Sequence, residues 1–120
     1  MEITQCLHTA LLVCDLDRAK HFYGTILNLP IAERDLKFAG VWYQVGNYQI
    51  HLIVNTEFSG NLYDRAKWGR NAHIAFNVDN LAELKQRLQA HNWPMQLSSS
   101  GRAAIFIQDA DKNIIEVNQM

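Results

Sequence analysis

The sequence predicts an α+β fold made of two tandem βαβββ modules. Three observations predict it. A segment that begins at His8 recurs at His73, so the chain carries an internal repeat with an offset of 65 residues. In each copy this apolar segment ends at a helix-start signal, and each helix is followed by three strand-like runs. A repeated unit of this size indicates two equivalent modules.

The repeat is clearest in residues 8–16 and 73–81, which share His, Ala, Val and Leu at equivalent positions. We expect module one over about 1–55, a linker over about 56–70 and module two over about 71–120. The modules should form a single domain, because 120 residues are enough for one core and too few for two independent ones.

Each module should contain one amphipathic helix after its first strand. Asp15 is expected to cap the first helix, which should end near Asn28. Asn80 should cap the second helix, and this helix should end near Asn92 because Pro94 disfavours helical geometry at the residue before it. The apolar stripes consist of Leu16, Ala19, Phe22, Tyr23, Ile26 and Leu27 in the first helix and of Leu81, Leu84 and Leu88 in the second.

The runs after each helix favour β-strands. We expect strands at residues 31–33, 41–45 and 48–54 in module one, and at 95–98, 103–108 and 113–118 in module two. Gly46 and Asn47 lie between two of these runs and indicate a hairpin turn. In the linker we expect a short helical turn at residues 62–67.

Four potential metal ligands occupy equivalent positions in the two modules. The offset that relates His8 to His73 also relates His51 to Glu116, so each module has one candidate in its first strand and one in its last. A pseudo-two-fold arrangement of the modules would bring all four side chains toward one axis. Imidazole nitrogen and carboxylate oxygen are usual ligands of zinc, iron, nickel and manganese. The pattern therefore predicts a site for one divalent metal ion.

A single histidine in a strand is more often a core or surface residue than a metal ligand. Two related pairs at the same offset favour the metal site over that interpretation. The other histidines, His21 and His91, lie on or just after the helices and have no such repeat partner, so we expect them to be solvated.

Composition disfavours some classes of function. Hydrophobic residues make up 48% of the chain and charged residues 19%, which is typical of a soluble globular protein. A net charge of −1 gives no field that would attract nucleic acid or a membrane surface. We expect no secretory signal, no membrane span and reduced cysteines at Cys6 and Cys14, hence a cytoplasmic protein.

The segments LHTALLV, YQIHL, AHIAF and DADKNIIE, together with residues 15–29, resemble the vicinal oxygen chelate superfamily. This superfamily includes glyoxalase I, fosfomycin-resistance proteins, extradiol dioxygenases and bleomycin-resistance proteins. The resemblance covers essentially the whole chain. It is specific for the superfamily and not for one activity.

The resemblance implies paired βαβββ modules whose mixed sheet curls around a metal cleft. It places His8, His51, His73 and Glu116 at the four ligand positions of the family, for one zinc, nickel, manganese or iron ion per site. It also implies a homodimer that shares its metal sites, and the uncovered apolar strand faces of a half-open cleft favour the same assembly.

Three functions remain open on this basis. The first is a metal-dependent lyase or isomerase of glyoxalase type, in which Glu116, or secondly His51, removes a proton next to a carbonyl of an oxygen-chelating substrate. The second is an iron dioxygenase that uses His8, His73 and Glu116 as a facial triad. The third is a non-catalytic protein that sequesters a small molecule.

Departures from the family pattern bear on this choice. Glyoxalase I usually has a carboxylate where this chain has His51, so the base would differ. Fosfomycin-transferring relatives place a threonine where this chain has Ala10, which disfavours that activity. The last hairpin has Ala110 and Lys112 in place of proline and glycine, with an expected effect on turn stability only.

Three further residues are candidates for the substrate pocket. Trp42 should lie opposite His51 if Gly46 and Asn47 form a two-residue turn, which would place an aromatic wall beside the metal. Phe106 and Arg102 lie near the equivalent hairpin of module two. Arg102 could hold an anionic group by a forked hydrogen bond, although a solvated loop arginine is an equal interpretation.

Overall fold

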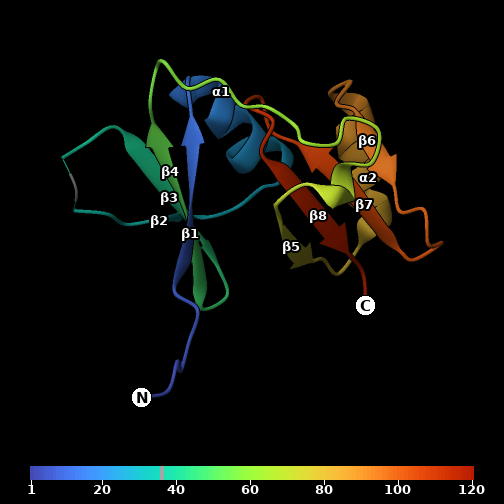
Figure 1. The fold of residues 1–120 in the computed structure, drawn as a ribbon, viewed down its shortest axis with the longest axis horizontal. Coiled ribbons are helices and arrows are strands. Elements are labelled where there is room, and N and C mark those ends of the chain that lie inside the picture. The colour runs from blue at the N-terminus through green and yellow to red at the C-terminus, as the bar shows by residue number, and fades with distance from the viewer. Residues whose placement is uncertain (36) are drawn as a thin grey trace. The chain divides into compact units, whose positions relative to one another are not determined.

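The structure is a computed structural model that describes residues 1–35 and 37–120. It divides the chain into two compact units, unit 1 over Met1–Phe58 and unit 2 over Ser59–Met120. Each unit contains a four-stranded mixed sheet and helical segments (Figure 1). The predicted α+β fold of two tandem βαβββ modules is confirmed.

Unit 1 has the strand order β1-β4-β3-β2. The elements are β1 (His8–Val13), α1 (Leu16–Lys20), the π-helix η1 (His21–Ile26), β2 (Ile31–Ala32), β3 (Gly40–Val45) and β4 (Tyr48–Val54). β1 is parallel to β4, whereas β3 is antiparallel to both β4 and β2. One side of the strands and the buried face of α1 and η1 form the core, which includes Phe22, Tyr23, Tyr43, Ile50 and Leu52.

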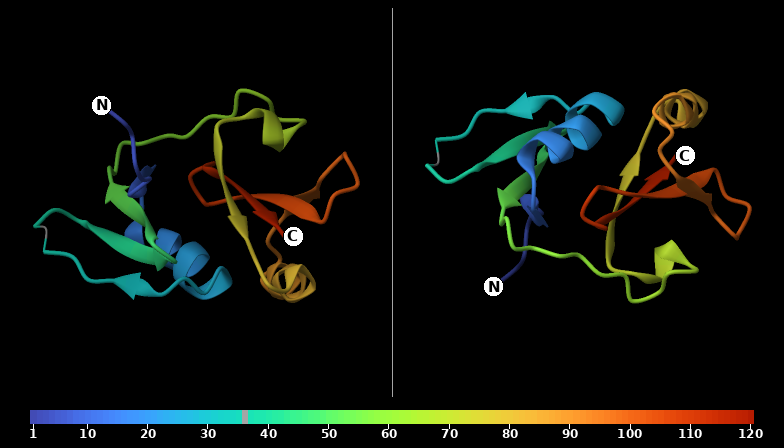
Figure 2. Two further views of the ribbon diagram at one scale, coloured as in Figure 1. Left: turned by 90° about the horizontal axis from the view of Figure 1, so that it is seen from below. Right: turned by 90° about the horizontal axis from the view of Figure 1, so that it is seen from above.

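Unit 2 repeats this topology with the order β5-β8-β7-β6. Its elements are the 3₁₀ helix η2 (Trp68–Arg70), β5 (His73–Asn77), α2 (Leu81–Ala90), β6 (Met95–Leu97), β7 (Ala104–Gln108) and β8 (Ile114–Asn118). Its core includes Leu84, Leu88, Ile105, Ile107 and Ile115. The two views of Figure 2 show the sheet and helix of each unit from below and from above.

Both predicted helix caps are present. The Asp15 carboxylate accepts a hydrogen bond from the backbone N–H of Arg18, and the Asn80 side chain accepts one from the N–H of Glu83. Each bond satisfies a backbone donor that the first helical turn leaves without a partner. The second helix ends at Ala90, close to the predicted end. The helical segment of unit 1 ends at Ile26, just before Asn28, which has a φ of 55°.

Two helical predictions differ from the structure. The first helix is α-helical only to Lys20 and continues as a π-helix, in which the backbone N–H of Leu27 donates to the carbonyl of Phe22. The helical turn expected at residues 62–67 is wrong, because the 3₁₀ helix lies at Trp68–Arg70. The Asp64 carboxylate accepts from the backbone N–H groups of Ala66 and Lys67, which holds this stretch in a turn.

Strand parity separates the two faces of each sheet. In β4, Ile50 and Leu52 are fully buried in the core, so Gln49 and His51 lie on the opposite face. In β8, Ile115 and Val117 are buried in the same way, so Glu116 lies on the opposite face. The candidate ligands are therefore outside the hydrophobic core of each unit. No helix in the described part of the chain is long and apolar enough to cross a membrane.

Candidate metal centre

The two units present their candidate ligands at the same strand register. In unit 1, β1 pairs with β4 so that Ala10 lies opposite His51, two residues after His8. In unit 2, β5 pairs with β8 so that Ala75 lies opposite Glu116, two residues after His73. Both pairings are parallel. His8 and His51 therefore have the same strand register in unit 1 as His73 and Glu116 have in unit 2, as the repeat predicts.

In unit 1 the two histidine rings form part of an aromatic stack. The rings of His8 and His51 lie 4.0 Å apart between centroids, with an interplanar angle of 14°. On the other side of His51, the Trp42 ring lies 3.9 Å away at 5°. Trp42 is the strand partner of His51, as the hairpin prediction required. His51 is thus held between two rings and is only 9% exposed.

A chain of side-chain amides determines the tautomer of His51. The Gln44 Nε2 amide donates to the backbone carbonyl of Gly46 at 2.7 Å, so Gln44 Oε1 is available to accept from Gln49 Nε2 at 2.8 Å. Gln49 Oε1 in turn lies 2.8 Å from His51 Nε2. Because an amide oxygen only accepts, His51 Nε2 must carry the proton, which leaves Nδ1 with the lone pair.

The environment also favours the neutral form of His51. Burial lowers its pKa, and the nearby His8 and Arg34 lower it further. A metal binds neutral imidazole, so this shift favours ligation. Ligation through Nδ1 would keep the bond to Gln49, whereas ligation through Nε2 would break it.

In unit 2 the corresponding pair brings an imidazole nitrogen close to a carboxylate oxygen. His73 Nδ1 donates to the backbone carbonyl of Asn71 at 2.7 Å, so in the neutral ring the lone pair is on Nε2. Nε2 lies 3.8 Å from Glu116 Oε1. A histidine that donates one ring N–H to a carbonyl and presents the other nitrogen to a carboxylate has the arrangement expected of a metal ligand.

Glu116 is oriented by two polar partners. Its Oε2 accepts from Asn118 Nδ2 at 2.9 Å, and its Oε1 accepts from Arg102 Nη2 at 3.4 Å. The hydrogen bond from Asn118 is the main cause that lowers the pKa of Glu116; burial opposes it, and Arg102 and His73 add to the lowering. The carboxylate is therefore ionised at neutral pH, which is the state that a metal requires.

The donor set fits a divalent metal. Two ligands about 2.1 Å from a tetrahedrally coordinated ion lie about 3.4 Å apart. His73 Nε2 and Glu116 Oε1 are 3.8 Å apart, so they would have to approach each other by about 0.4 Å to hold one such ion. Neither unit by itself groups three or more His, Cys, Asp or Glu side chains for a metal among its described residues.

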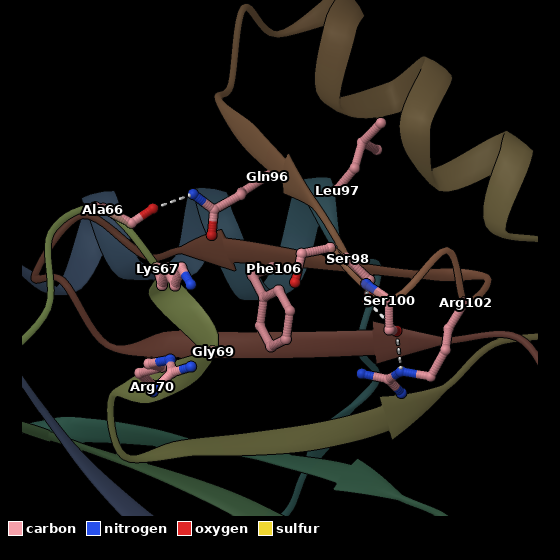
Figure 3. A pocket seen from close by; sticks show the side chains of 11 residues that line it. Ala66, Lys67, Gly69, Arg70, Gln96, Leu97, Ser98, Ser100, Arg102 and Phe106 are labelled. Atoms are coloured by element: carbon pink, nitrogen blue, oxygen red, sulfur yellow. Dashed lines mark hydrogen bonds between the residues drawn. The ribbon is translucent and has the colours of Figure 1, made fainter.

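The pocket candidates of unit 2 lie beside this pair. Phe106 is the strand partner of Glu116, and its ring contacts the His73 ring edge-to-face at 5.6 Å between centroids. It thus has the same position relative to Glu116 that Trp42 has relative to His51. Phe106 and Arg102 both line a cavity of about 530 Å³ (Figure 3).

Three residues that orient the candidate ligands were not predicted from the sequence. Gln49 precedes His51 by two residues, Asn71 precedes His73 by two, and Asn118 follows Glu116 by two. Gln49 and Asn118 lie on the same strand faces as the ligands they contact, because side chains repeat every two residues along a strand. A polar residue two positions from a candidate ligand in the same strand is therefore the sequence signal that could have identified Gln49 and Asn118.

Comparison with known proteins gives one family and many structural matches. The sequence model of the Glyoxalase/Bleomycin resistance protein/Dioxygenase superfamily matches residues 5–117. No curated protein matches the sequence significantly.

Three solved structures illustrate the structural similarity. A lactoylglutathione lyase from Agrobacterium tumefaciens is 23% identical, with a TM-score of 0.70 over 99% of this chain and 96% of that one. A glyoxalase/dioxygenase from Nostoc punctiforme is 21% identical, with a TM-score of 0.77 over 96% and 90%. A genomically encoded fosfomycin resistance protein from Listeria monocytogenes is 19% identical, with a TM-score of 0.74 over 99% and 95%. At these identities the similarity establishes the fold.

Proposed function

Because the chain belongs to the glyoxalase/bleomycin resistance protein/dioxygenase superfamily, we propose that it is a metal-dependent enzyme of glyoxalase type. It would catalyse a lyase or isomerase reaction on a small oxygen-rich molecule. The observation that carries this proposal is the His73–Glu116 pair, in which an imidazole nitrogen and an ionised carboxylate oxygen face each other at 3.8 Å. His8 and His51 would complete the ligand set from the equivalent strands of a unit 1.

Each residue has a role that follows from its contacts. A bound divalent metal would act as a Lewis acid on two neighbouring oxygens of the substrate. Glu116 is the first candidate for the base, because its carboxylate is ionised at neutral pH and lies 3.8 Å from the His73 ring nitrogen; its lowered pKa makes it a weak base. His51 is the second candidate, since its lowered pKa also keeps it unprotonated. Trp42 and Phe106 would form apolar walls next to the reacting groups.

The identity of the bound metal tests this proposal. We expect elemental analysis of protein purified without chelators to find nickel, zinc or manganese, with no oxygen consumption when catechols are added. Iron together with oxygen uptake would instead support the dioxygenase alternative. Purified protein that holds no metal and takes up none on addition would support the sequestering alternative and contradict an enzyme of this type.

Arg102 should compete with the metal for Glu116. Its guanidinium donates to Glu116 Oε1 at 3.4 Å and its side chain is 53% exposed. Loss of this partly exposed ion pair in Arg102→Met should raise the affinity for Zn²⁺ about two- to fivefold, as measured by isothermal titration calorimetry. Arg65→Met, which removes the same charge from the exposed loop before η2, should leave the affinity unchanged. A weaker affinity in Arg102→Met alone would show that Arg102 supports ligation.

We also propose a homodimer with shared metal sites. Large apolar side chains are exposed on both units, among them Leu12 at 39%, Ile31 at 69% and Leu97 at 63%. A second copy of the chain would cover part of this surface. Light scattering at micromolar concentration should give twice the mass of one chain, and a monomeric mass would contradict this assembly.

A further inference from the structure

The cavity of about 530 Å³ in unit 2 is built around the Phe106 ring. One wall is the loop that leads into η2, and the other is the segment after β6, which carries three consecutive serines (Figure 3). Gly69 lies directly on the ring, since a Cβ added there would be 2.6 Å from Phe106 Cζ. The aromatic floor and the two walls belong to one unit.

The charges that line this cavity have one sign. Lys67, Arg70 and Arg102 line it, and no aspartate or glutamate does so among the described residues. Arg102 is paired with Glu116. Lys67 and Arg70 have no carboxylate within 4.0 Å in the part of the chain that the structure describes. Lys67 and Arg70 therefore give the hollow a positive potential, whereas the charge of Arg102 is offset by Glu116.

The backbone that carries two of these cations is held firmly. The Gln96 side chain accepts from the backbone N–H of Trp68 at 2.9 Å and donates to the carbonyl of Ala66 at 2.8 Å. The buried Asn71 amide donates to three carbonyls of the same loop, one of which is the carbonyl of Asp64 at 2.8 Å. Lys67 and Arg70 therefore project from a fixed wall, which lowers the entropic cost of ligand binding.

Neutral hydrogen-bonding groups complete the opposite wall. Ser98 and Ser100 share a hydrogen bond of 2.8 Å between their hydroxyls, and Arg102 Nε donates to Ser100 Oγ at 3.0 Å. A hydroxyl can also donate to an anionic oxygen. Hydroxyl and guanidinium groups on one wall and two cations on the other suit a ligand with several oxygen acceptors.

We propose that this cavity binds the anionic group, a carboxylate or a phosphate, of the molecule that reacts at the His73–Glu116 pair. The inference rests on the proposed function and names the class of its substrate as anionic. Arg102 links the cavity to the His73–Glu116 pair, because it lines the cavity and donates a hydrogen bond to Glu116. The volume is within the range of small-molecule sites.

A titration followed by NMR tests this proposal on the full chain. Inorganic phosphate and acetate are added separately to metal-free protein at constant ionic strength, with chloride as the balancing ion. We expect saturable shifts of the backbone amides of Gly69 and Ser98–Ser100 with at least one anion. Arg70→Gln should weaken binding about fivefold, because it removes a charged donor. Arg65→Gln removes the same charge from the same loop outside the cavity and should change the affinity less than twofold.

The outcomes of the titration distinguish a phosphorylated substrate, a carboxylic acid and the absence of an anion site. Tighter binding of phosphate assigns a phosphorylated substrate, and tighter binding of acetate assigns a carboxylic acid. Absence of saturation with both anions, or equal weakening by Arg65→Gln and Arg70→Gln, would overturn the proposal. Since the titration uses metal-free protein, a failure of anion binding is distinct from a failure of the metal site, which elemental analysis reports separately.

Discussion

His73→Ala and Glu116→Ala are each expected to lower the affinity for the divalent metal more than about tenfold, since even a residue that only orients a ligand typically contributes ten- to a hundredfold. Each change removes one of two donor atoms that face each other at 3.8 Å. Elemental analysis after gel filtration measures the effect as metal bound per chain. Circular dichroism of each variant shows that the loss does not result from unfolding.

His91→Ala is the matched control for these variants. His91 caps the end of α2 and belongs to neither candidate pair. It should keep the metal content of the unmodified protein. If His73→Ala and Glu116→Ala also keep that content, the assignment of the site is wrong.

Gly60→Ala is expected to lower the free energy of unfolding by more than about 2 kcal/mol, which is larger than the typical effect of one substitution. A Cβ at Gly60 would lie 1.8 Å from the backbone carbonyl oxygen of Asp111, so the backbone must move. The turn that holds this carbonyl yields little, because the Asp109 carboxylate accepts from the backbone N–H groups of Asp111 and Asn113. Urea denaturation measures the change.

Gly46→Asn provides the comparison for that variant. Gly46 has a φ of 57°, which asparagine tolerates better than other residues, and an added Cβ meets nothing within 4 Å. Its free energy of unfolding should change by less than about 1 kcal/mol. Equal destabilisation by both substitutions would contradict the steric explanation.

Local chemistry allowed most of the fold to be predicted from the sequence. The Asp15 and Asn80 caps are one-residue signals whose hydrogen bonds form within one helical turn. The Gly46 turn fixed the hairpin register and hence the pairing of Trp42 with His51. The π-helical turn of the first helix was not predictable, because its buried residues have the same spacing signal as an α-helix.

The candidate site was predictable only in part. Repeat symmetry predicted that His8 and His51 correspond to His73 and Glu116, and the strand pairing bears out this equivalence. The carbonyl that fixes the His73 tautomer belongs to Asn71, whose loop is held by contacts distant in sequence, such as those of Gln96. Such contacts leave no periodic signal, and for the same reason the helical turn of the linker was predicted at the wrong residues.

Crystals of the metal-loaded protein, measured at the absorption edge of the bound metal, test the central claim most directly. We predict one anomalous peak per site, within about 2.5 Å of a nitrogen of His8, His51 and His73 and of an oxygen of Glu116. A metal held by only one pair and completed by other residues, or located away from all four, would contradict the account.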